Sequence, residues 1–135
     1  MRSRPSVRVR RTVLPLLEEQ LGPGVATTLA RTADQLRADM DLLDDLADTA
    51  YAELRGADGT LPATGLAARP GPVRTRVLRL AALAAGAPAS ELFHEHVQAM
   101  DALLTDWHGQ RWIDLPGHLR CTRTDGRLRI GRSTP

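Results

Sequence analysis

Aromatic residues are scarce in this sequence, and lysine is absent. Aromatic side chains make up 3% of its 135 residues, whereas hydrophobic residues make up 42%. A chain of this length can form one domain with a real core, or a small domain with an appendage. That core must be built mainly from Leu, Val and Ala, which favours helices. All 18 basic residues are Arg, a bias typical of a GC-rich genome, and Arg provides bidentate phosphate contacts that Lys does not.

Cysteine is almost absent as well. The single Cys121 excludes an internal disulfide and a C-x-x-C metal site, and its position in a predicted strand favours a small, inert packing residue. The four histidines are His94, His96, His108 and His118. His94 and His96 are two residues apart, so on a helix they point in different directions and do not chelate one metal together. We therefore expect no metal site.

No long apolar run is present either. The longest weakly polar stretch, residues 80–89, is too short and too rich in Ala and Gly to span a bilayer. Arginines follow Met1, but no apolar segment comes after them, which is not the pattern of a signal peptide. We expect a cytoplasmic protein that has no membrane partner.

Sequence signatures of catalysis are also missing. There is no G-x-x-x-x-G-K-[ST] loop, no G-x-G-x-x-G loop and no S-G-G-x-D-S loop. Asp44, Asp45 and Asp48 form a carboxylate cluster, but without a base, nucleophile or metal partner a solvated helix face explains them better than acid–base catalysis. We therefore expect no catalytic residue and no bound cofactor in this chain.

Charge, by contrast, is present in alternating blocks. Five arginines fall in the first eleven residues, and residues 34–58 then carry eight acidic residues against two arginines. Residues 59–90 contain four arginines and no acidic residue, and residues 111–132 contain six arginines against two acidic residues. This distribution suggests one face for a polyanion and one solvated face. Arginines scattered over an ordinary surface remain the alternative.

Hydrophobic spacing predicts four helices, at about residues 8–21, 25–55, 72–86 and 90–107. The second has apolar residues at alternating intervals of four and three, which predicts a seam for packing against another helix. The seam residues are Leu29, Ala33, Leu36, Met40, Leu43, Ala47, Ala50 and Leu54. Bundle packing within the chain and self-association as a coiled coil are both open, and the later apolar helices favour the bundle.

Details at the ends of the helices complete this prediction. Pro15 suggests a true first turn near Thr12, and Ser90 is the expected N-cap of the last helix. The third helix is expected to bury Val73, Val77, Leu80 and either Leu83 or Ala84. The last is expected to present an apolar face of Leu92, His96 or Val97, Met100, Leu103, Leu104 and Trp107.

The remaining segments predict a linker and a small sheet. Residues 56–72 are rich in Gly, Ala and Pro and indicate a linker, with one short apolar contact through Leu61 and Leu66. Residues 111–115, 118–122 and 127–130 indicate strands, and Asp125-Gly126 is a strong hairpin signal.

The predicted fold class is mainly α. We expect a four-helix bundle-like domain with a short C-terminal antiparallel β-meander. The expected domains are a helical part over residues 1–110, a β-meander packed on it over 111–131, and a tail over 132–135.

Arginines near helices are the candidate binding residues. Arg8 and Arg10 share one face if extended and diverge if helical, whereas Arg76 and Arg79 share a helix face. Together with Arg74 they could hold a structured RNA by its shape and phosphates. The few aromatic residues argue against a stacking platform for unpaired bases. Ion pairs to the Asp-rich helix at residues 25–55 are the alternative role of these arginines.

Five stretches resemble the tRNA(Ile)-lysidine synthetases, in particular their actinobacterial members. They are RVRRTVLPLLEE at 8–19, GVATTLARTA at 24–33, VRTRVLRLAALAAGAP at 73–88, HVQAMDALLTDWHGQR at 96–111 and DLPGHLRCTRTDGRL at 114–128. No single stretch is diagnostic, but their order is fairly specific, and together they span about residues 8–130.

The resemblance implies a function. The family uses ATP, with Mg, to adenylate the wobble cytidine of a CAU-anticodon tRNA(Ile), and lysine then displaces AMP. The ATP chemistry belongs to an N-terminal ATP-binding domain that this sequence lacks, so the chain resembles the helical tRNA-recognition part alone. The implied partners are tRNA(Ile) and that N-terminal domain, with a homodimer as a further possibility. Arg8, Arg10, Arg74, Arg76 and Arg79 are the implied tRNA contacts. A helical protein–protein interaction module and a catalytically inert remnant are the rival interpretations.

Overall fold

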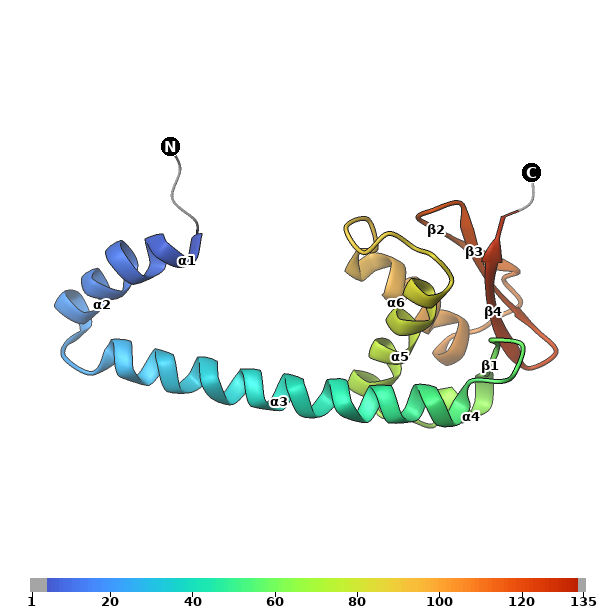
Figure 1. Cartoon of the computed structure of the whole chain (residues 1–135), viewed down its shortest axis with the longest axis horizontal. Helices are drawn as coiled ribbons and strands as arrows, with labels where there is room; N and C mark the ends of the chain where they lie inside the picture. Colours follow the sequence, from blue (N-terminus) through green and yellow to red (C-terminus); the bar gives the residue numbers. More distant parts are fainter. Residues whose placement is uncertain (1–4, 134–135) are drawn as a thin grey trace. The chain divides into compact units, whose positions relative to one another are not determined.

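The computed structural model describes residues 5–133, and they form two compact units (Figure 1). The first unit extends to Asp41 and the second begins at Leu42, so the boundary falls inside a long helix. Two positions of the expected 132–135 tail, and Arg2 and Arg4 of the basic N-terminal block, lie outside the described residues.

The first unit is a pair of helical segments joined by a tight turn. Its first segment contains α1 (Pro5–Arg8), a π-helical turn (Val9–Val13) and α2 (Leu14–Leu21). In the π-helical turn, the N–H of Leu14 bonds to the carbonyl of Val9. Pro15 follows directly; because it lacks an N–H and its ring crowds the preceding turn, it accounts for the widened turn. The helix therefore begins before Thr12, earlier than Pro15 suggested.

Glu18 connects α2 to the following helix, α3 (Val25–Leu54). The N–H groups of Gly24 and Ala26 donate to its two carboxylate oxygens at 2.6 and 2.8 Å. These N–H groups lie at the start of α3 and have no partner within the helix, so the carboxylate caps it. The bonds to Ala26 and Gly24 lower the pKa of Glu18.

The predicted long helix from Val25 is confirmed as α3, but the apolar seam of α3 is buried only toward the end of the helix. Ala47 and Ala50 are buried in the second unit. Leu29, Leu36 and Met40 are 42%, 57% and 55% exposed, and no residue from 5 to 41 is buried. Leu29 and Ala33 of the seam share an open groove with Val9 and Leu14, but no residue of this seam is buried within the first unit.

The second unit contains four strands and three further helices. They are β1 (Leu61–Pro62), α4 (Ala63–Ala67), α5 (Gly71–Ala84), α6 (His94–Thr105), β2 (Trp112–Leu115), β3 (Leu119–Thr124) and β4 (Arg127–Arg132). The strands form one antiparallel sheet in the order β1-β4-β3-β2. The β3–β4 turn has positive φ at Asp125 (54°) and Gly126 (74°), as a type I′ hairpin requires. The expected hairpin is confirmed.

The predicted linker at residues 56–72 is instead partly ordered into β1 and α4. Thr60, which is buried, makes the connection that fixes β1 beside β4. The Nε of Arg127 donates to its hydroxyl at 2.6 Å and an Nη donates to its carbonyl at 3.1 Å. Leu61 and Leu66 are buried, so their predicted apolar contact is confirmed.

The core of the second unit lies where the sheet meets the helices. It includes Ala47, Leu61, Leu66, Val77, Leu78, Met100, Leu103, Leu115, Leu119, Cys121 and Leu128. The buried side of α5 is Val73, Val77, Leu78, Ala81 and Ala82. Leu80 and Leu83 are only half-buried and Ala84 is exposed, so the expected stripe was correct at its first two positions only.

The last predicted helix also needs correction at both ends. Residues 88–92 form a turn closed by bonds from Glu91 and Leu92 to the Pro88 carbonyl. The helix therefore begins at His94 instead of next to Ser90, and His96 Nδ1 accepts the Phe93 N–H at 2.9 Å. Trp107 lies beyond the end of the helix and is 47% exposed. Val97, Met100, Leu103 and Leu104 are buried as predicted.

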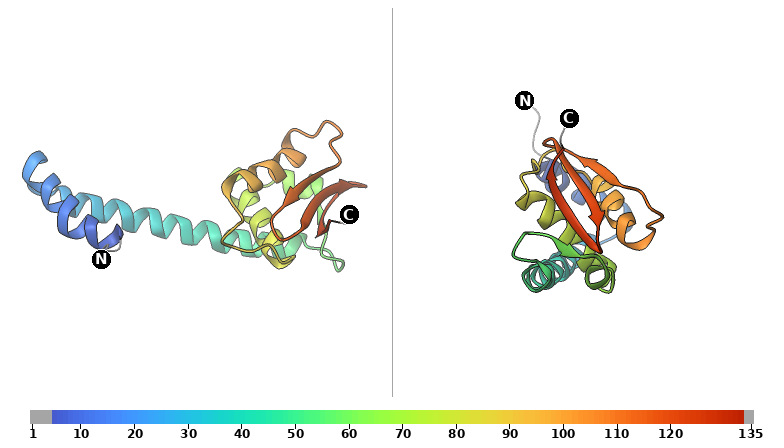
Figure 2. Two further views of the ribbon diagram at one scale, coloured as in Figure 1. Left: turned by 90° about the horizontal axis from the view of Figure 1, so that it is seen from above. Right: turned by 90° about the vertical axis from the view of Figure 1, so that its right-hand side faces the viewer.

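The mainly helical class and the C-terminal antiparallel sheet are confirmed, but a four-helix bundle is not. In the second unit, helices and sheet share one core, and the right-hand view of Figure 2 shows the red and orange strands in front of the helices. No helix from residue 5 to residue 133 is long and apolar enough to cross a membrane.

Candidate nucleic-acid interface

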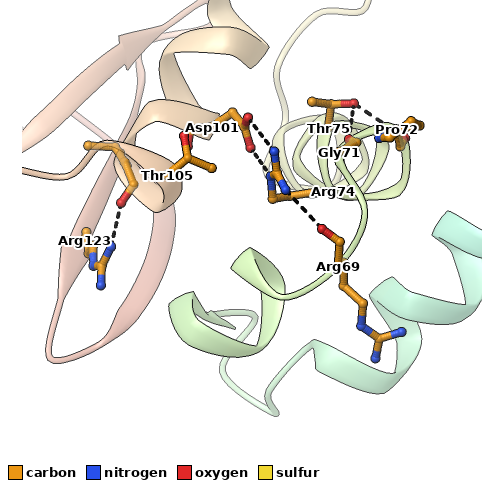
Figure 3. Close-up of polar contacts among 9 residues, drawn as sticks. Arg69, Gly71, Pro72, Arg74, Thr75, Asp101, Thr105 and Arg123 are labelled. Carbon is orange, nitrogen blue, oxygen red and sulfur yellow. Dashed lines mark hydrogen bonds and ion pairs between the residues drawn. The ribbon is translucent and has the colours of Figure 1, made fainter.

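Arg74 holds α5 against α6. Its Nε and one Nη donate to the two carboxylate oxygens of Asp101 at 2.5 and 3.1 Å, and its other Nη donates to the carbonyl of Arg69 at 3.0 Å (Figure 3). The side chains of Arg74 and Asp101 are only 16% and 12% exposed. The hydrogen bond to Asp101 raises the pKa of Arg74 above its ordinary value. A bidentate ion pair of this kind fixes the orientation of both side chains.

Arg76 and Arg79 lie on the other side of α5. The Nε of Arg76 pairs with Asp44 of α3 at 2.9 Å, and one of its Nη atoms donates to the carbonyl of Pro72. The Nη of Arg79 donates to the carbonyl of Leu92 at 2.9 Å. Both arginines line a hollow of about 340 Å³ together with Asp44 and Asp48. The alternative role, an ion pair to the Asp-rich helix, is thus confirmed for Arg76.

Arg8 and Arg10 belong to the first unit and are exposed. Both lie in helical backbone, at the end of α1 and in the π-helical turn, so their side chains diverge. Arg10 borders a groove whose apolar walls include Val9, Leu14 and Leu29. Among residues 5–133, neither arginine is in an ion pair.

The five expected arginines therefore form two groups. Arg8 and Arg10 lie in one unit, and Arg74, Arg76 and Arg79 lie along one helix of the other. Within the second group, Arg76 and Arg79 share a hollow, whereas Arg74 is directed at α6. Free guanidinium donors are thus more available in the first group.

Groups for metal or nucleophilic chemistry are not assembled in the part of the chain that the structure describes. No three His, Cys, Asp or Glu side chains converge there as a metal site would require. Cys121 is fully buried in β3, and burial raises the pKa of its thiol to about 12. The thiol stays protonated at neutral pH, so the predicted inert packing role is confirmed.

Comparison with known families identifies the second unit. The profile of the TilS substrate binding domain matches residues 61–129, about half of the chain. The chain belongs to the TilS substrate-binding domain family. This match contains α5, α6 and the sheet up to the middle of β4, with Arg74, Arg76 and Arg79, and it leaves out Arg8, Arg10 and α3.

Individual relatives match nearly the whole chain. It is 51% identical over 121 residues to tRNA(Ile)-lysidine synthase of Thermobifida fusca, which covers 90% of this chain and 37% of the relative. It is 49% identical over 123 residues to the synthase of Streptomyces coelicolor, covering 91% and 35%. For the synthase of Salinispora tropica, the identity is 48% over 121 residues, covering 90% and 36%. The chain thus spans little more than a third of the relatives that it matches.

A further arginine group in this domain was not assigned from the sequence. Arg120, Arg129 and Arg132 line one hollow beside Trp112 on the sheet. The sequence has an arginine-rich block at residues 111–132, but its composition alone does not show which of these side chains share a face. Alternation along residues 119–124 and 127–132 would have placed Arg120 and Arg129 together.

Proposed function

We propose that this chain is the tRNA-recognition part of a tRNA(Ile)-lysidine synthetase. In such an enzyme, ATP would activate the wobble cytidine of CAU-anticodon tRNA(Ile), and lysine would be ligated onto it by a new C–N bond. The observation that carries the proposal is the substrate-binding-domain match over residues 61–129, on the structural unit that has its own core.

Within this proposal, the arginines have different parts. Arg8 and Arg10 contact phosphates, because their exposed guanidinium groups have no ion-pair partner among the described residues. Arg76 and Arg79 contribute weaker contacts, because the carboxylates of Asp44 and Asp48 lie in the same hollow. Arg74 is a positioning residue. Its ion pair with Asp101 fixes α5, the helix that carries Arg76 and Arg79.

ATP and Mg belong to the proposed N-terminal ATP-binding domain, not to this chain. The sequence has no phosphate-binding loop of the expected type, so we expect this chain alone to be inactive. The ATP-binding domain is also the occupant that we propose for the uncovered apolar residues of the first unit, such as Leu36 and Met40. Exposed apolar surface of this kind marks an interaction site. A homodimer through the same residues is the alternative.

Binding to tRNA tests the proposal directly. The whole chain is titrated into fluorescent CAU-anticodon tRNA(Ile) transcript at several salt concentrations, and anisotropy is recorded. We expect binding that weakens steeply with salt, because phosphate contacts release counterions. Replacing both Arg8 and Arg10 by Ala should lower the salt slope by about two, roughly one per phosphate contact.

The matched control replaces Arg31 and Arg37, exposed arginines of the same unit, and should change the slope less. Absence of tRNA binding by the wild-type chain would overturn the proposal. An unchanged slope in the Arg8→Ala, Arg10→Ala variant would remove these two contacts from it.

The enzymatic part of the proposal has its own test. This chain, the part of the Thermobifida fusca relative that lies outside the match, and both together are each incubated with the tRNA, ATP, Mg and lysine. Nucleoside mass analysis should detect lysidine only where both proteins are present. Salt-insensitive self-association without RNA affinity would instead favour the protein–protein interaction module.

A further inference from the structure

The outward face of the sheet carries an exposed tryptophan with an arginine held over it. Trp112 of β2 is 45% exposed, and the guanidinium carbon of Arg120 lies 4.3 Å from the centre of its ring. The Nε of Arg120 also pairs with Asp114 at 2.9 Å. Asp114 thereby fixes the guanidinium against one face of the indole, a cation–π contact that also orients the ring.

Strand register places further donors beside this pair. Trp112 lies opposite Thr122, which lies opposite Arg129, and Asp114 lies opposite Arg120, which lies opposite Gly131. Since alternate residues of a strand share a face, these residues line one surface. It encloses an open hollow of about 240 Å³ lined by Trp112, Arg120, Thr122, Arg129, Gly131 and Arg132.

Glycine at position 131 keeps this hollow open. A side chain there would meet no atom within 4 Å, so glycine is not required by crowding within the protein. Gly131 lies opposite Arg120 and lines the hollow, so any larger residue would instead project into it. An aromatic wall and an open floor are thus present on the same face as the exposed side chain of Arg129, and Arg132 at the end of β4 also borders the hollow.

We propose that this tryptophan–arginine face binds an unpaired RNA nucleotide. The base stacks against Trp112, and Arg129 and Arg132 contact the adjoining phosphates. RNA-binding proteins hold unpaired bases by stacking on aromatic rings and guanidinium planes, and every base provides the required π-face. Arg129 can exchange its carboxylate partner for a phosphate. Its only ion pair among the described residues is a loose one to Asp58 at 3.7 Å, and its side chain is 63% exposed.

The scarcity of aromatic residues argues against an extended stacking platform, but one exposed ring is enough to stack one base. The inference rests on the proposed function in one respect, since tRNA is the RNA that would supply the nucleotide. The surface itself consists only of residues in the second unit.

The second tryptophan supplies a matched control. Trp107 is also about half exposed and has Arg123 stacked over it at 4.4 Å. Its Nε1 donates to the carbonyl of Gln110, however, and Arg123 donates to the carbonyl of Leu103. The Trp107–Arg123 pair is therefore tied to the end of α6, with no comparable arginine-lined hollow in the described part of the chain.

The experiment uses two single-tryptophan proteins. Trp107→Phe leaves Trp112 as the only tryptophan, and Trp112→Phe leaves Trp107. Each is titrated with CAU-anticodon tRNA(Ile) transcript, with a short oligouridylate and with oligoglutamate, which supplies charge without a base. We expect both RNAs to quench Trp112 but not Trp107, and oligoglutamate to quench neither. Trp112→Ala should weaken oligouridylate binding about tenfold, as loss of one stacked base would.

Each outcome has a defined meaning. Quenching of Trp112 by oligouridylate without any tRNA binding would support the nucleotide site while overturning the proposed tRNA function. Binding of tRNA in the anisotropy assay without quenching of Trp112 by either RNA would overturn the nucleotide site and leave the proposed function standing. Equal quenching by oligoglutamate would show a general anion surface that an acidic protein segment could occupy, and would also overturn the nucleotide site. Arg129→Ala with Arg132→Ala should reduce the salt dependence of oligouridylate binding, and circular dichroism confirms that each variant is folded.

Discussion

The two units of this chain use the same apolar residue types in opposite ways. The second unit buries leucines and alanines from helices and sheet in one core, with Leu66, Leu78 and Leu103 fully inaccessible. The first unit leaves Leu29, Leu36 and Met40 exposed, and no described residue in it is buried. Helices in proteins owe most of their stability to the packing of an apolar face. The second unit therefore has the means to stay folded alone, whereas the first has no buried core of its own among the described residues.

The polar contacts differ in the same way. In the second unit, Arg74 and Asp101 form a bidentate ion pair that is largely buried. In the first unit, Arg37 and Asp34 form an exposed i,i+3 pair at 3.6 Å. Exposed pairs of this kind contribute little, whereas breaking a buried pair leaves an uncompensated charge. Equivalent substitutions in the two units should therefore have very different effects.

The largest difference is expected for leucine truncation. Leu103→Ala removes a fully buried side chain from α6 and should lower the free energy of unfolding by about 3–4 kcal/mol. Leu36→Ala, in the exposed seam of α3, should change it by less than about 0.5 kcal/mol. Urea unfolding followed by tryptophan fluorescence measures this, because Trp107 and Trp112 both lie in the second unit. Equal losses would show that the α3 seam is packed in solution.

Removal of a carboxylate should give the next largest contrast. Asp101→Ala leaves Arg74 without its shielded partner and should cost roughly 3 kcal/mol in the same urea experiment. Asp34→Ala removes the exposed partner of Arg37 and should cost at most about 1 kcal/mol. A small effect of Asp101→Ala would mean that water or another group replaces the carboxylate beside Arg74.

The link between β1 and β4 should give a smaller effect. Thr60→Val keeps the shape of the side chain but removes the hydroxyl that donates to Asp58 at 2.7 Å and accepts from Arg127. We expect a loss of about 1–2 kcal/mol, because two part-buried hydrogen bonds to the charged groups of Asp58 and Arg127 are lost. Thr64→Val, at an exposed position of α4, is the control. If the two variants have the same urea midpoint, the role of Thr60 is refuted.

The smallest effect concerns acid pH in the first unit. Because capping lowers the folded-state pKa of Glu18 below its ordinary value of 4.5, its contribution is present above about pH 4.5 and is lost as pH falls through the lower folded value. Amide exchange at Gly24 and Ala26 should therefore accelerate, beyond the intrinsic pH trend, only under acid conditions. Glu18→Gln should abolish this pH dependence, whereas Glu19→Gln should preserve it. Retention of the acid response in Glu18→Gln would assign it to another group.

Local signals in the sequence predicted the elements whose determinants are near in sequence. The periodic seam predicted α3, and Asp125-Gly126 predicted the β3–β4 hairpin. The strand β1 was missed because Thr60 meets Arg127 from 67 residues away, a contact without a local pattern. The start of α6 was misplaced because Ser90 and Glu91 match a cap, although both belong to the preceding turn.

The candidate site was predictable to a lesser extent. Positive charge at Arg76 and Arg79 and their common side of α5 could be seen from spacing. The partners of these side chains could not, since Asp44 is 32 residues from Arg76 and Asp101 is 27 residues from Arg74. Composition also concealed the Trp112 face, because it counts aromatic residues without showing which are exposed.

Hydrogen exchange of the isolated chain, read by NMR amide by amide, tests the contrast between the units most directly. Amides within α5, α6 and β3 should exchange only through global unfolding, whereas those of residues 5–41 should exchange through local opening, orders of magnitude faster. Addition of the part of the Thermobifida fusca relative that lies outside the match to this chain should then slow exchange in the first unit. Equal protection of both units in the isolated chain would contradict the account, because it would show that the first unit needs no partner.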